Sequence, residues 1–241
     1  MPPREFVSLA ADLGCRHIST GLESHPHSSM GYLPFSLRED SALRAQMIAT
    51  MRDRGIRDRV HDLELLAELG AQRINTVALD PDLNRSVEQF GLLAEAAAAF
   101  GMETTVEPSP GLTIGDLPTA LYAIRQVGRS DFRLLIDTMH IIRSGSTPDD
   151  VAALEPDVIG YIQLSDAPLV PTTPDYMTEA MFERMVPGTG GLPLLDLLAA
   201  LPRDLPIGLE IPIRSQAEAG ISPHDRLGRC VESARGLLAQ L

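Results

Sequence analysis

Residues 132–140 read Phe-Arg-Leu-Leu-Ile-Asp-Thr-Met-His, a short apolar run that ends at an acidic side chain. Short apolar runs between helical segments are typical of buried parallel strands. Residues 102–210 hold four such runs, and each is closed by one oxygen-bearing side chain. The four closing residues are Glu107, Asp137, Gln163 and Glu210. The repeated pattern predicts a parallel sheet whose strands end in polar groups.

The spacing of the closing residues predicts the fold class. Glu107 and Asp137 are 30 residues apart, and Asp137 and Gln163 are 26 apart, which is close to one βα unit in each case. The third interval, 47 residues, holds one unit plus a Pro- and Thr-rich insertion at 168–191. We predict an α/β protein, a (β/α)8 TIM barrel forming a single domain over residues 1–241. An open doubly wound sheet is the alternative, but no glycine-rich fingerprint follows an early strand.

The amino-terminal part fits the barrel less well, because it begins with a predicted helix at 3–14 and not with a strand. We expect the barrel to lack its first strand or to have irregular first and third strands. Two explanations stay open: the barrel starts upstream of Met1, or it is open beside its last strand. A gap beside the first helix would favour a homodimer. The other expected strands lie at 16–22, 56–60 (a poor strand), 73–79, 102–106, 132–136, 158–162 and 206–209, and the other long helices at 41–55, 62–69, 86–100 and 223–241.

Charge and composition exclude several classes of protein. All 20 basic residues are arginines, and 33 acidic residues bring the net charge to −13. Nucleic acid is disfavoured as a partner, because affinity for a polyanion comes from clustered basic residues. A Schiff-base lysine is excluded. The sequence has no apolar stretch of membrane-spanning length and no signal peptide, so we expect no membrane partner and a cytoplasmic location.

The four strand-end residues predict a metal site. Side chains at the carboxyl ends of barrel strands converge on one mouth, where three carboxylates would repel one another without a cation. Oxygen ligands favour Mg²⁺ or Mn²⁺ over Zn²⁺. Such an ion can bind the adjacent carbonyl and hydroxyl oxygens of a sugar-like substrate and stabilise an enediolate. The alternative is that each acidic residue caps the next helix or is a solvated loop residue.

The motifs together resemble the xylose isomerase-like barrel superfamily. This group contains sugar and sugar-phosphate isomerases and epimerases, inosose and dehydroshikimate dehydratases, and endonuclease IV. The resemblance covers the chain from about residue 63 to the end and, more weakly, the first helix. It rests on Glu107, Asp137-Thr138-Met139-His140, Gln163-Leu164-Ser165-Asp166-Ala167, Arg184-x-x-Pro187-Gly188 and Glu210.

The resemblance implies a role for each matching residue. Glu107, Asp137, Gln163 and Glu210 fall at the positions of the family's four metal ligands. His140 falls at a substrate-contacting histidine, and Arg184 at an arginine that binds substrate oxygens. Two positions depart from the family: Gln163 replaces a frequent histidine, as in some dehydroshikimate dehydratases, and Thr189 replaces the usual glutamate of Pro-Gly-Glu-Gly. Endonuclease IV chemistry is disfavoured, because it needs a histidine-rich site with several metals.

We therefore expect a metal-dependent isomerase or epimerase of a small keto-sugar, polyol or sugar phosphate. Glu107 and Glu210 would exchange a proton on opposite faces of the substrate, with His140 as a further catalytic group. The expected substrate contacts are His140, Arg184, Asp166 and His25, although His25 is equally well read as a solvated loop histidine. A dehydratase (lyase) of the 3-dehydroshikimate type is the first alternative. A non-catalytic ligand-binding barrel is the second.

Overall fold

The structure is a computed structural model of the whole chain, and it describes residues 1–21, 23, 34–54 and 63–241. The described residues form two compact units, one of residues 1–74 with 95–103 and one of residues 75–94 with 104–241. Each unit has a buried apolar cluster of its own. The poor strand expected at 56–60 and the proposed contact His25 both lie outside the described residues.

The first unit is mainly helical. Its helices are α1 (Pro3–Asp12), α2 (Ser41–Arg54) and α3 (Leu63–Leu69), close to the predicted segments. Helix α1 ends at Asp12, and Gly14, the predicted stop residue, follows with a φ of 71°, the left-handed conformation that glycine adopts without strain. Apolar side chains of these helices, including Val7, Met47 and Leu66, are fully buried in one cluster.

The strand expected at residues 16–22 is wrong for the part of this segment that the structure describes. His17 makes a single bridge, and its described neighbours have no strand conformation. The physical reason lies in the packing of the segment, because Ile18 is the one described residue of this stretch that is buried. A buried parallel strand needs apolar side chains on both faces.

Five strands form one sheet, in the order β1-β2-β3-β4-β5. The pairs β2–β3, β3–β4 and β4–β5 are parallel. Each strand lies where the sequence predicts one, and Asp137 at the end of β3 pairs in register with Gln163 of β4. This arrangement confirms an α/β fold and an incomplete (β/α)8 barrel. The strands are β1 (Arg73–Thr76), β2 (Glu103–Val106), β3 (Phe132–Asp137), β4 (Ile159–Leu164) and β5 (Ile207–Leu209).

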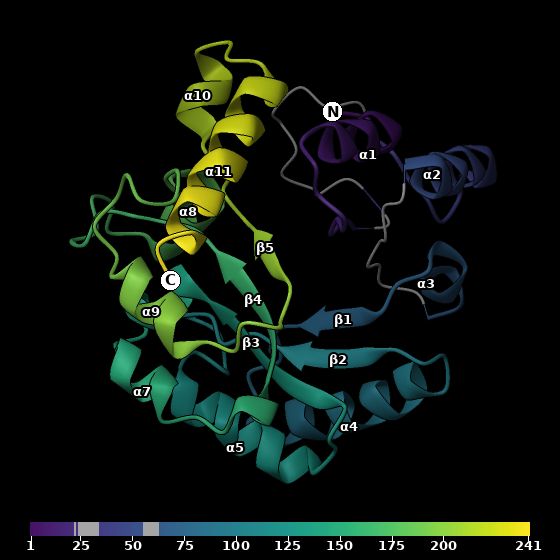
Figure 1. Ribbon diagram of the computed structural model, residues 1–241. Helices are drawn as coiled ribbons and strands as arrows, with labels where there is room; N and C mark the ends of the chain where they lie inside the picture. The colour runs from purple at the N-terminus through teal and green to yellow at the C-terminus, as the bar shows by residue number, and fades with distance from the viewer. Residues whose placement is uncertain (22, 24–33, 55–62) are drawn as a thin grey trace. The chain divides into compact units, whose positions relative to one another are not determined.

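Helices connect the strands of the second unit. Helix α5 packs on β3, α7 packs on α9, and Figure 1 shows these three helices along the same side of the sheet. Local signals fix the ends of α5, since the Asp116 side chain accepts the Thr119 N–H and Gly128 ends the helix in the left-handed conformation. The helices are α4 (Leu83–Ala98), α5 (Leu117–Val127), α6 (Thr138–Arg143), α7 (Pro148–Ala152), α8 (Tyr176–Phe182), α9 (Leu194–Ala200), α10 (Arg214–Glu218) and α11 (Pro223–Leu238), with a 3-10 turn at Pro156–Val158.

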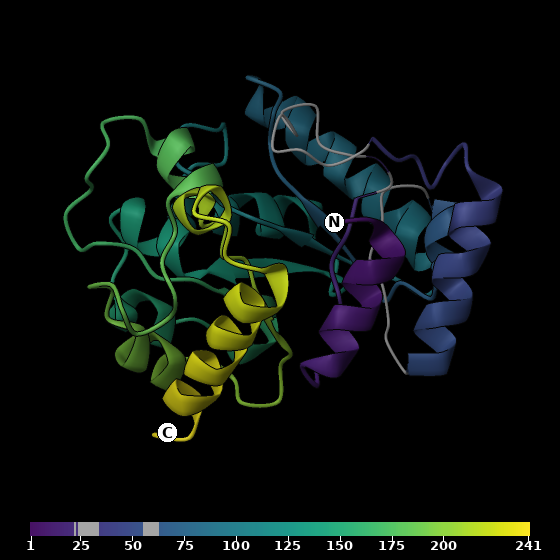
Figure 2. The same ribbon diagram turned by 90° about the horizontal axis from the view of Figure 1, so that it is seen from above.

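The insertion at 168–191 folds back onto the second unit, and Figure 2 shows this part of the chain, in green, as a long loop that leads into α8. An ion pair holds α8 in place, because Arg143 Nη2 lies 2.8 Å from Oε1 of the buried Glu179. After α8 the chain makes two antiparallel bridges, Glu183 with Ile213 and Met185 with Asp166. None of the helices formed by the described residues has the length and apolar character needed to cross a membrane.

Candidate functional site

Asp137 combines a structural and an electrostatic role. Its Oδ1 accepts the backbone N–H groups of Met139 and His140, both at 2.9 Å, so it caps α6. Its Oδ2 accepts a hydrogen bond from Arg184 Nη1 at 2.6 Å. Burial by itself raises the pKa of this fully buried carboxyl group, but the positive charges of Arg184 and His140 outweigh that effect and lower it. Asp137 therefore caps α6, the alternative role considered for such residues, and it also forms an ion pair with Arg184.

Arg184 is the buried cation of the site. The two bridges at Glu183 and Met185 hold the backbone on either side of it. Its guanidinium group donates to Ala180 O at 2.8 Å and Ser165 Oγ at 3.0 Å, besides the bond to Asp137. Burial lowers the pKa of Arg184, but the nearby carboxylates, Asp137 foremost, raise it above its usual value. A permanently charged group therefore lies among the strand-end acids.

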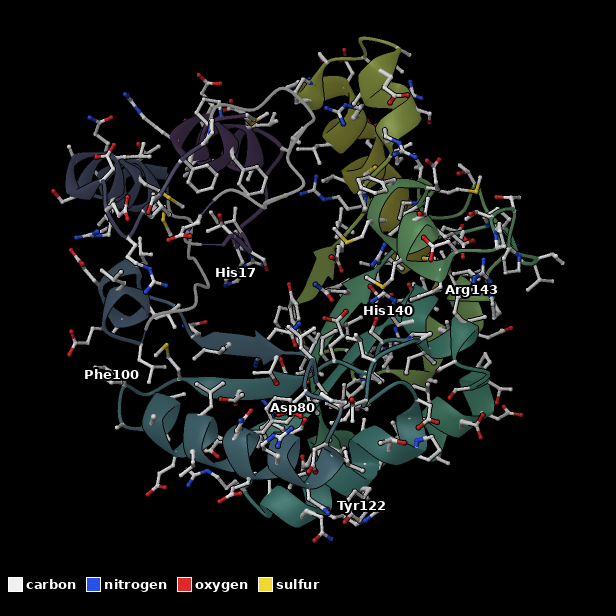
Figure 3. All side chains as sticks on the ribbon, turned by 180° about the vertical axis from the view of Figure 1, so that it is seen from behind. His17, Asp80, Phe100, Tyr122, His140 and Arg143 are labelled. Carbon is white, nitrogen blue, oxygen red and sulfur yellow. The ribbon has the colours of Figure 1, made fainter. Side chains whose placement is uncertain are left out.

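His140, labelled in Figure 3, is on α6, and its ring contacts side chains from three other parts of the site. Its Nε2 is 3.2 Å from Glu107 Oε1. Its Nδ1 is hydrogen-bonded to the Tyr176 hydroxyl and lies 3.5 Å from Asp137 Oδ1. Burial lowers the pKa of His140, but the carboxylates of Asp137 and Glu107 outweigh burial and raise it. The imidazole thus joins the end of β2, the end of β3 and the insertion.

Glu107 directly follows β2, and a neighbouring strand orients it. Asn75 on β1 donates from Nδ2 to Glu107 Oε2 at 2.6 Å, and Thr105 Oγ1 donates to Asn75 Oδ1 at 3.1 Å. Sequence analysis missed Asn75, although an amide side chain inside the apolar run at 73–79 is a usable signal. It also gave no role to Ser165, the residue that accepts from Arg184.

Glu210 directly follows β5 and is the most exposed acid of the site, with 43% of its side chain accessible. Its Oε2 lies 3.4 Å from Arg184 Nη2. Desolvation by the surrounding protein is the main influence on its pKa despite that exposure, and the charges of Glu107 and Asp137 add to it. Together they raise the pKa of Glu210 to about 7, against the opposing effect of Arg184.

The donor atoms of the site suit a divalent cation. Ligand atoms of Glu107, Asp137 and His140 all lie within 4.8 Å of one another, and Glu210 is not a member of this group. Gln163 Oε1 is buried and has no hydrogen-bond partner in the structure. A buried amide oxygen is costly to leave without a donor or a cation, so this atom fits the role of a ligand. The residues present therefore agree with a metal site, with His140 as a further nitrogen donor beside the oxygen-bearing side chains.

Two expected substrate contacts are not placed in this cluster. Asp166 is buried, and its carboxylate accepts the N–H groups of Ala167, Gly188, Gly190 and Leu192 at 2.8–3.2 Å. These four bonds use its acceptor positions, so they make it the anchor of the loop at 188–192 and give no support to substrate binding. The other contact, His25, lies outside the described residues.

Comparison with known protein families matches residues 4–229, nearly the whole chain, to the family described as xylose isomerase-like TIM barrel. The chain belongs to this family. Members of the family whose reactions are known are enzymes, and the site described above lies within the matched residues.

The individual proteins that resemble this chain share only 15–26% of its sequence. A 3-dehydroshikimate dehydratase from Pseudomonas aeruginosa is 26% identical over 205 residues, which cover 82% of this chain and 29% of the relative. The chain thus spans less than a third of that curated relative. Among solved structures, the IOLI protein with a bound zinc atom has a TM-score of 0.78 at 15% identity, covering 97% of this chain and 92% of its own. A D-allulose 3-epimerase from Methylomonas sp. has a TM-score of 0.68 at 16% identity, covering 98% and 91%. At such identities the two structures support the fold alone.

Proposed function

We propose that this family member is a divalent-metal-dependent isomerase or epimerase of a small keto-sugar, polyol or sugar phosphate. The observation that carries the proposal is the grouping of Glu107 and Glu210 with Asp137 around the guanidinium group of Arg184 and the imidazole ring of His140. The arrangement offers two acid–base groups and two donors for substrate oxygens within one cluster. That combination suits transfer of a proton at a carbon next to a carbonyl group.

The cation would be held by the four strand-end residues Glu107, Asp137, Gln163 and Glu210. His140 lies near enough to Glu107 and Asp137 to add a nitrogen donor. Bound there, Mg²⁺ or Mn²⁺ would stabilise the negative charge that develops on the substrate oxygens. Arg184 supplies a second, permanent positive charge on the same side chains, since it contacts both Asp137 and Glu210.

The protein's own groups would move the proton. Glu107 accepts it from the substrate carbon at Oε1, the oxygen that faces His140, while Asn75 holds Oε2. Glu210 returns a proton to the opposite face of the same carbon, which inverts its configuration. Arg184 and His140 orient the carbonyl and hydroxyl oxygens by donating hydrogen bonds. In the reverse direction the two glutamates exchange roles.

Deuterium exchange tests this division of labour. We expect the wild-type protein loaded with Mn²⁺ to exchange the α-hydrogen of a ketohexose, D-fructose or D-allulose, for solvent deuterium. Glu107→Gln and Glu210→Gln should each slow this exchange by about 10²–10⁴-fold, the usual contribution of a positioned acid or base. Glu232→Gln, at an exposed position of α11, is the matched control and should exchange like wild type. Unchanged exchange in both site variants would exclude the proposed roles.

A dehydratase reaction is the second candidate, and two observations favour it: the 26% identity to the Pseudomonas aeruginosa relative, and Gln163 in place of a histidine. In this case the same proton removal is followed by loss of a β-hydroxyl group as water. Incubation with 3-dehydroshikimate would then produce a conjugated product with new ultraviolet absorbance. If neither substrate class reacts and Mn²⁺ causes no thermal shift, a non-catalytic ligand-binding barrel is the better description.

A further inference from the structure

A second buried arginine, Arg143, binds the same helix as Arg184. Arg143 is the last residue of α6, and Figure 3 labels it together with His140 of that helix. Its guanidinium group meets Glu179 of α8 at two points, Nε to Oε2 at 2.9 Å and Nη2 to Oε1 at 2.8 Å. Only 7% of the Arg143 side chain and 1% of the Glu179 side chain are exposed. A buried pair with two parallel bonds fixes the orientation of both partners, so Arg143 fixes the turn of α8 that contains Glu179.

The same guanidinium group also holds the beginning of the insertion. Its Nη2 donates to Pro168 O at 2.6 Å, and its Nη1 donates to Leu169 O at 3.2 Å. A lysine could not reproduce this set of bonds, because an ammonium group lacks the planar fork of a guanidinium group. Arg143 therefore ties α6 to two separate parts of the insertion, residues 168–169 and Glu179.

The turn of α8 that Arg143 fixes is the turn that binds Arg184. Ala180 directly follows Glu179, and its carbonyl oxygen accepts from Arg184 Nε at 2.8 Å. The Glu179 carbonyl oxygen accepts the N–H of Glu183, the residue before Arg184, at 2.9 Å. Another nitrogen of the same guanidinium group, Nη1, donates to Asp137 Oδ2 at 2.6 Å. The direction in which Arg184 presents its Nη groups therefore depends on the position of Ala180 O.

We propose that Arg143 is a positioning residue that orients Arg184 through Glu179 and the carbonyl group of Ala180. One buried arginine thus serves the insertion, and through α8 it aims the second one at the strand-end acids. The catalytic meaning of this contact rests on the proposed function, in which Arg184 orients substrate oxygens. The orientation of Arg184 does not itself depend on that function.

The Nε–H group of Arg184 reports its bond to Ala180 directly. The full chain is labelled with ¹⁵N-arginine, and exchange of the Nε–H protons with solvent is measured by NMR at neutral pH with Mg²⁺ added. Arg184→Lys, which has no Nε–H group, assigns the signal. We expect slow exchange in the wild-type protein. Arg143→Lys keeps the charge but loses the two-point pair, so it should speed this exchange at least about tenfold by making local opening of α8 easier.

Arg129→Lys is the matched control. Arg129 also meets an aspartate, Asp131, at two points, 2.8 Å and 2.7 Å, but it lies between α5 and β3 and about a third of each side chain is exposed. This variant removes the same kind of fork from a pair that is not in contact with α8. It should leave the exchange of the Arg184 signal unchanged. An increase as large as that in Arg143→Lys would overturn the proposal, because the effect would then not be specific to the buried pair.

A double variant guards against a folding defect of Arg143→Lys. Arg143→Met combined with Glu179→Leu removes both charges, so no unpaired charge stays buried. We expect the Arg184 Nε–H to exchange at least about tenfold faster here too, because the α6–α8 tie is lost. Exchange as slow as in wild type, in either folded variant, would overturn the proposal. Fast exchange in the wild-type protein would overturn it without any variant.

Turnover separates this proposal from the proposed function. On a substrate that depends on Arg184, Arg143→Lys should lower kcat/KM by up to about 10²-fold, the effect of a misplaced orienting group, whereas Arg129→Lys should match wild type. If Arg184→Lys retains full activity while Arg143→Lys still speeds the Nε–H exchange, the substrate role of Arg184 fails and the positioning by Arg143 stands. If Arg184→Lys is inactive and the exchange does not respond to Arg143, the proposed function stands and the role of Arg143 fails.

Discussion

Asp137 and Asp166 occupy similar places in successive βα units and both accept backbone N–H groups, but only Asp137 also has charged side-chain partners. Both are buried aspartates at or just after the end of an apolar strand, β3 for Asp137 and β4 for Asp166. Asp137 faces the guanidinium group of Arg184 and the ring of His140. Asp166 faces backbone N–H groups. The same residue type at the same kind of position therefore serves a charged cluster in one unit and a loop in the next.

The difference between these partners indicates which of the two acids belongs to a functional site. When four backbone N–H groups donate to one carboxylate, its acceptor positions are used and none remains for a ligand. A carboxylate that shares its oxygens with charged side chains belongs to a cluster whose net charge depends on every member. Asp137 meets the second description, and Asp166 meets the first.

The largest effect is expected from Asp137→Asn. The amide can still accept the capping N–H groups at one oxygen, but its NH₂ group would face Arg184 and leave that buried cation without its main partner. Breaking a buried ion pair in this way typically costs about 3–5 kcal/mol. We expect this loss in urea unfolding, together with Mn²⁺ affinity reduced at least about tenfold in calorimetry.

Asp166→Asn is the comparison variant. It also replaces a buried carboxylate by an amide, but the groups that lose an acceptor are neutral N–H groups of the loop at 188–192. We expect a stability loss of about 1–3 kcal/mol and Mn²⁺ affinity close to that of wild type. Equal loss of Mn²⁺ affinity in both variants would remove the distinction between the two aspartates.

Gly190→Ala should disturb the same Asp166 anchor to a similar extent, without removing the carboxylate. A Cβ at position 190 would lie 2.4 Å from Asp166 Oδ1 and 2.5 Å from Ala167 O, so the loop or the carboxylate must move. We expect a loss of about 1–3 kcal/mol in urea unfolding, as for other overpacked sites.

Gly236→Ala, on the exposed side of α11 with open space around its Cβ, is the matched control. It should stabilise the protein by about 0.5–1 kcal/mol, because alanine loses less conformational freedom than glycine in a helix. A stabilising Gly190→Ala would show that the loop does not depend on the close approach to Asp166.

Much of the fold could be predicted from the sequence, because the apolar runs at 132–136 and 158–162 are bounded by clear helix signals. The strand at 16–22 could not. Its amino-acid types permit a strand, but pairing depends on a neighbour that local sequence does not specify. The division of the described residues into two units was not predicted either, since it depends on packing between distant segments.

The candidate site was predictable in part. The spacing of Glu107, Asp137 and Glu210 was enough to expect them together, because parallel strands of similar length end at one edge. The bonds of Asn75 and Tyr176 were beyond sequence reasoning, since both depend on side-chain positions set by separate elements. The same holds for Asp166: its four N–H partners come mostly from a loop more than 20 residues further along the chain.

The smallest effect is expected at Asp80, an acid in the loop after β1 that extends the comparison to the protein surface. Hydrogen bonds from the Arg85 side chain and the Asp82 backbone lower the pKa of Asp80 to about 2. Both partners are accessible, with 22% of the Asp80 side chain and 54% of the Arg85 side chain exposed. Because Asp80 titrates lower in the folded state, its contribution to stability is present above its usual pKa of 3.8 and is lost as pH falls toward 2.

Arg85→Ala should move the pKa of Asp80 back toward 3.8, which an NMR titration of the carboxyl group would measure. The acid-side decline of unfolding free energy should become shallower in that range, because the folded and unfolded pKa values then nearly coincide. Mn²⁺ affinity should not change, since solvent screens a surface pair that shares no partner with Asp137. A pKa that stays near 2 in this variant would mean that the backbone N–H of Asp82 is sufficient, and that Asp80 belongs with Asp166 among the acids held by the main chain.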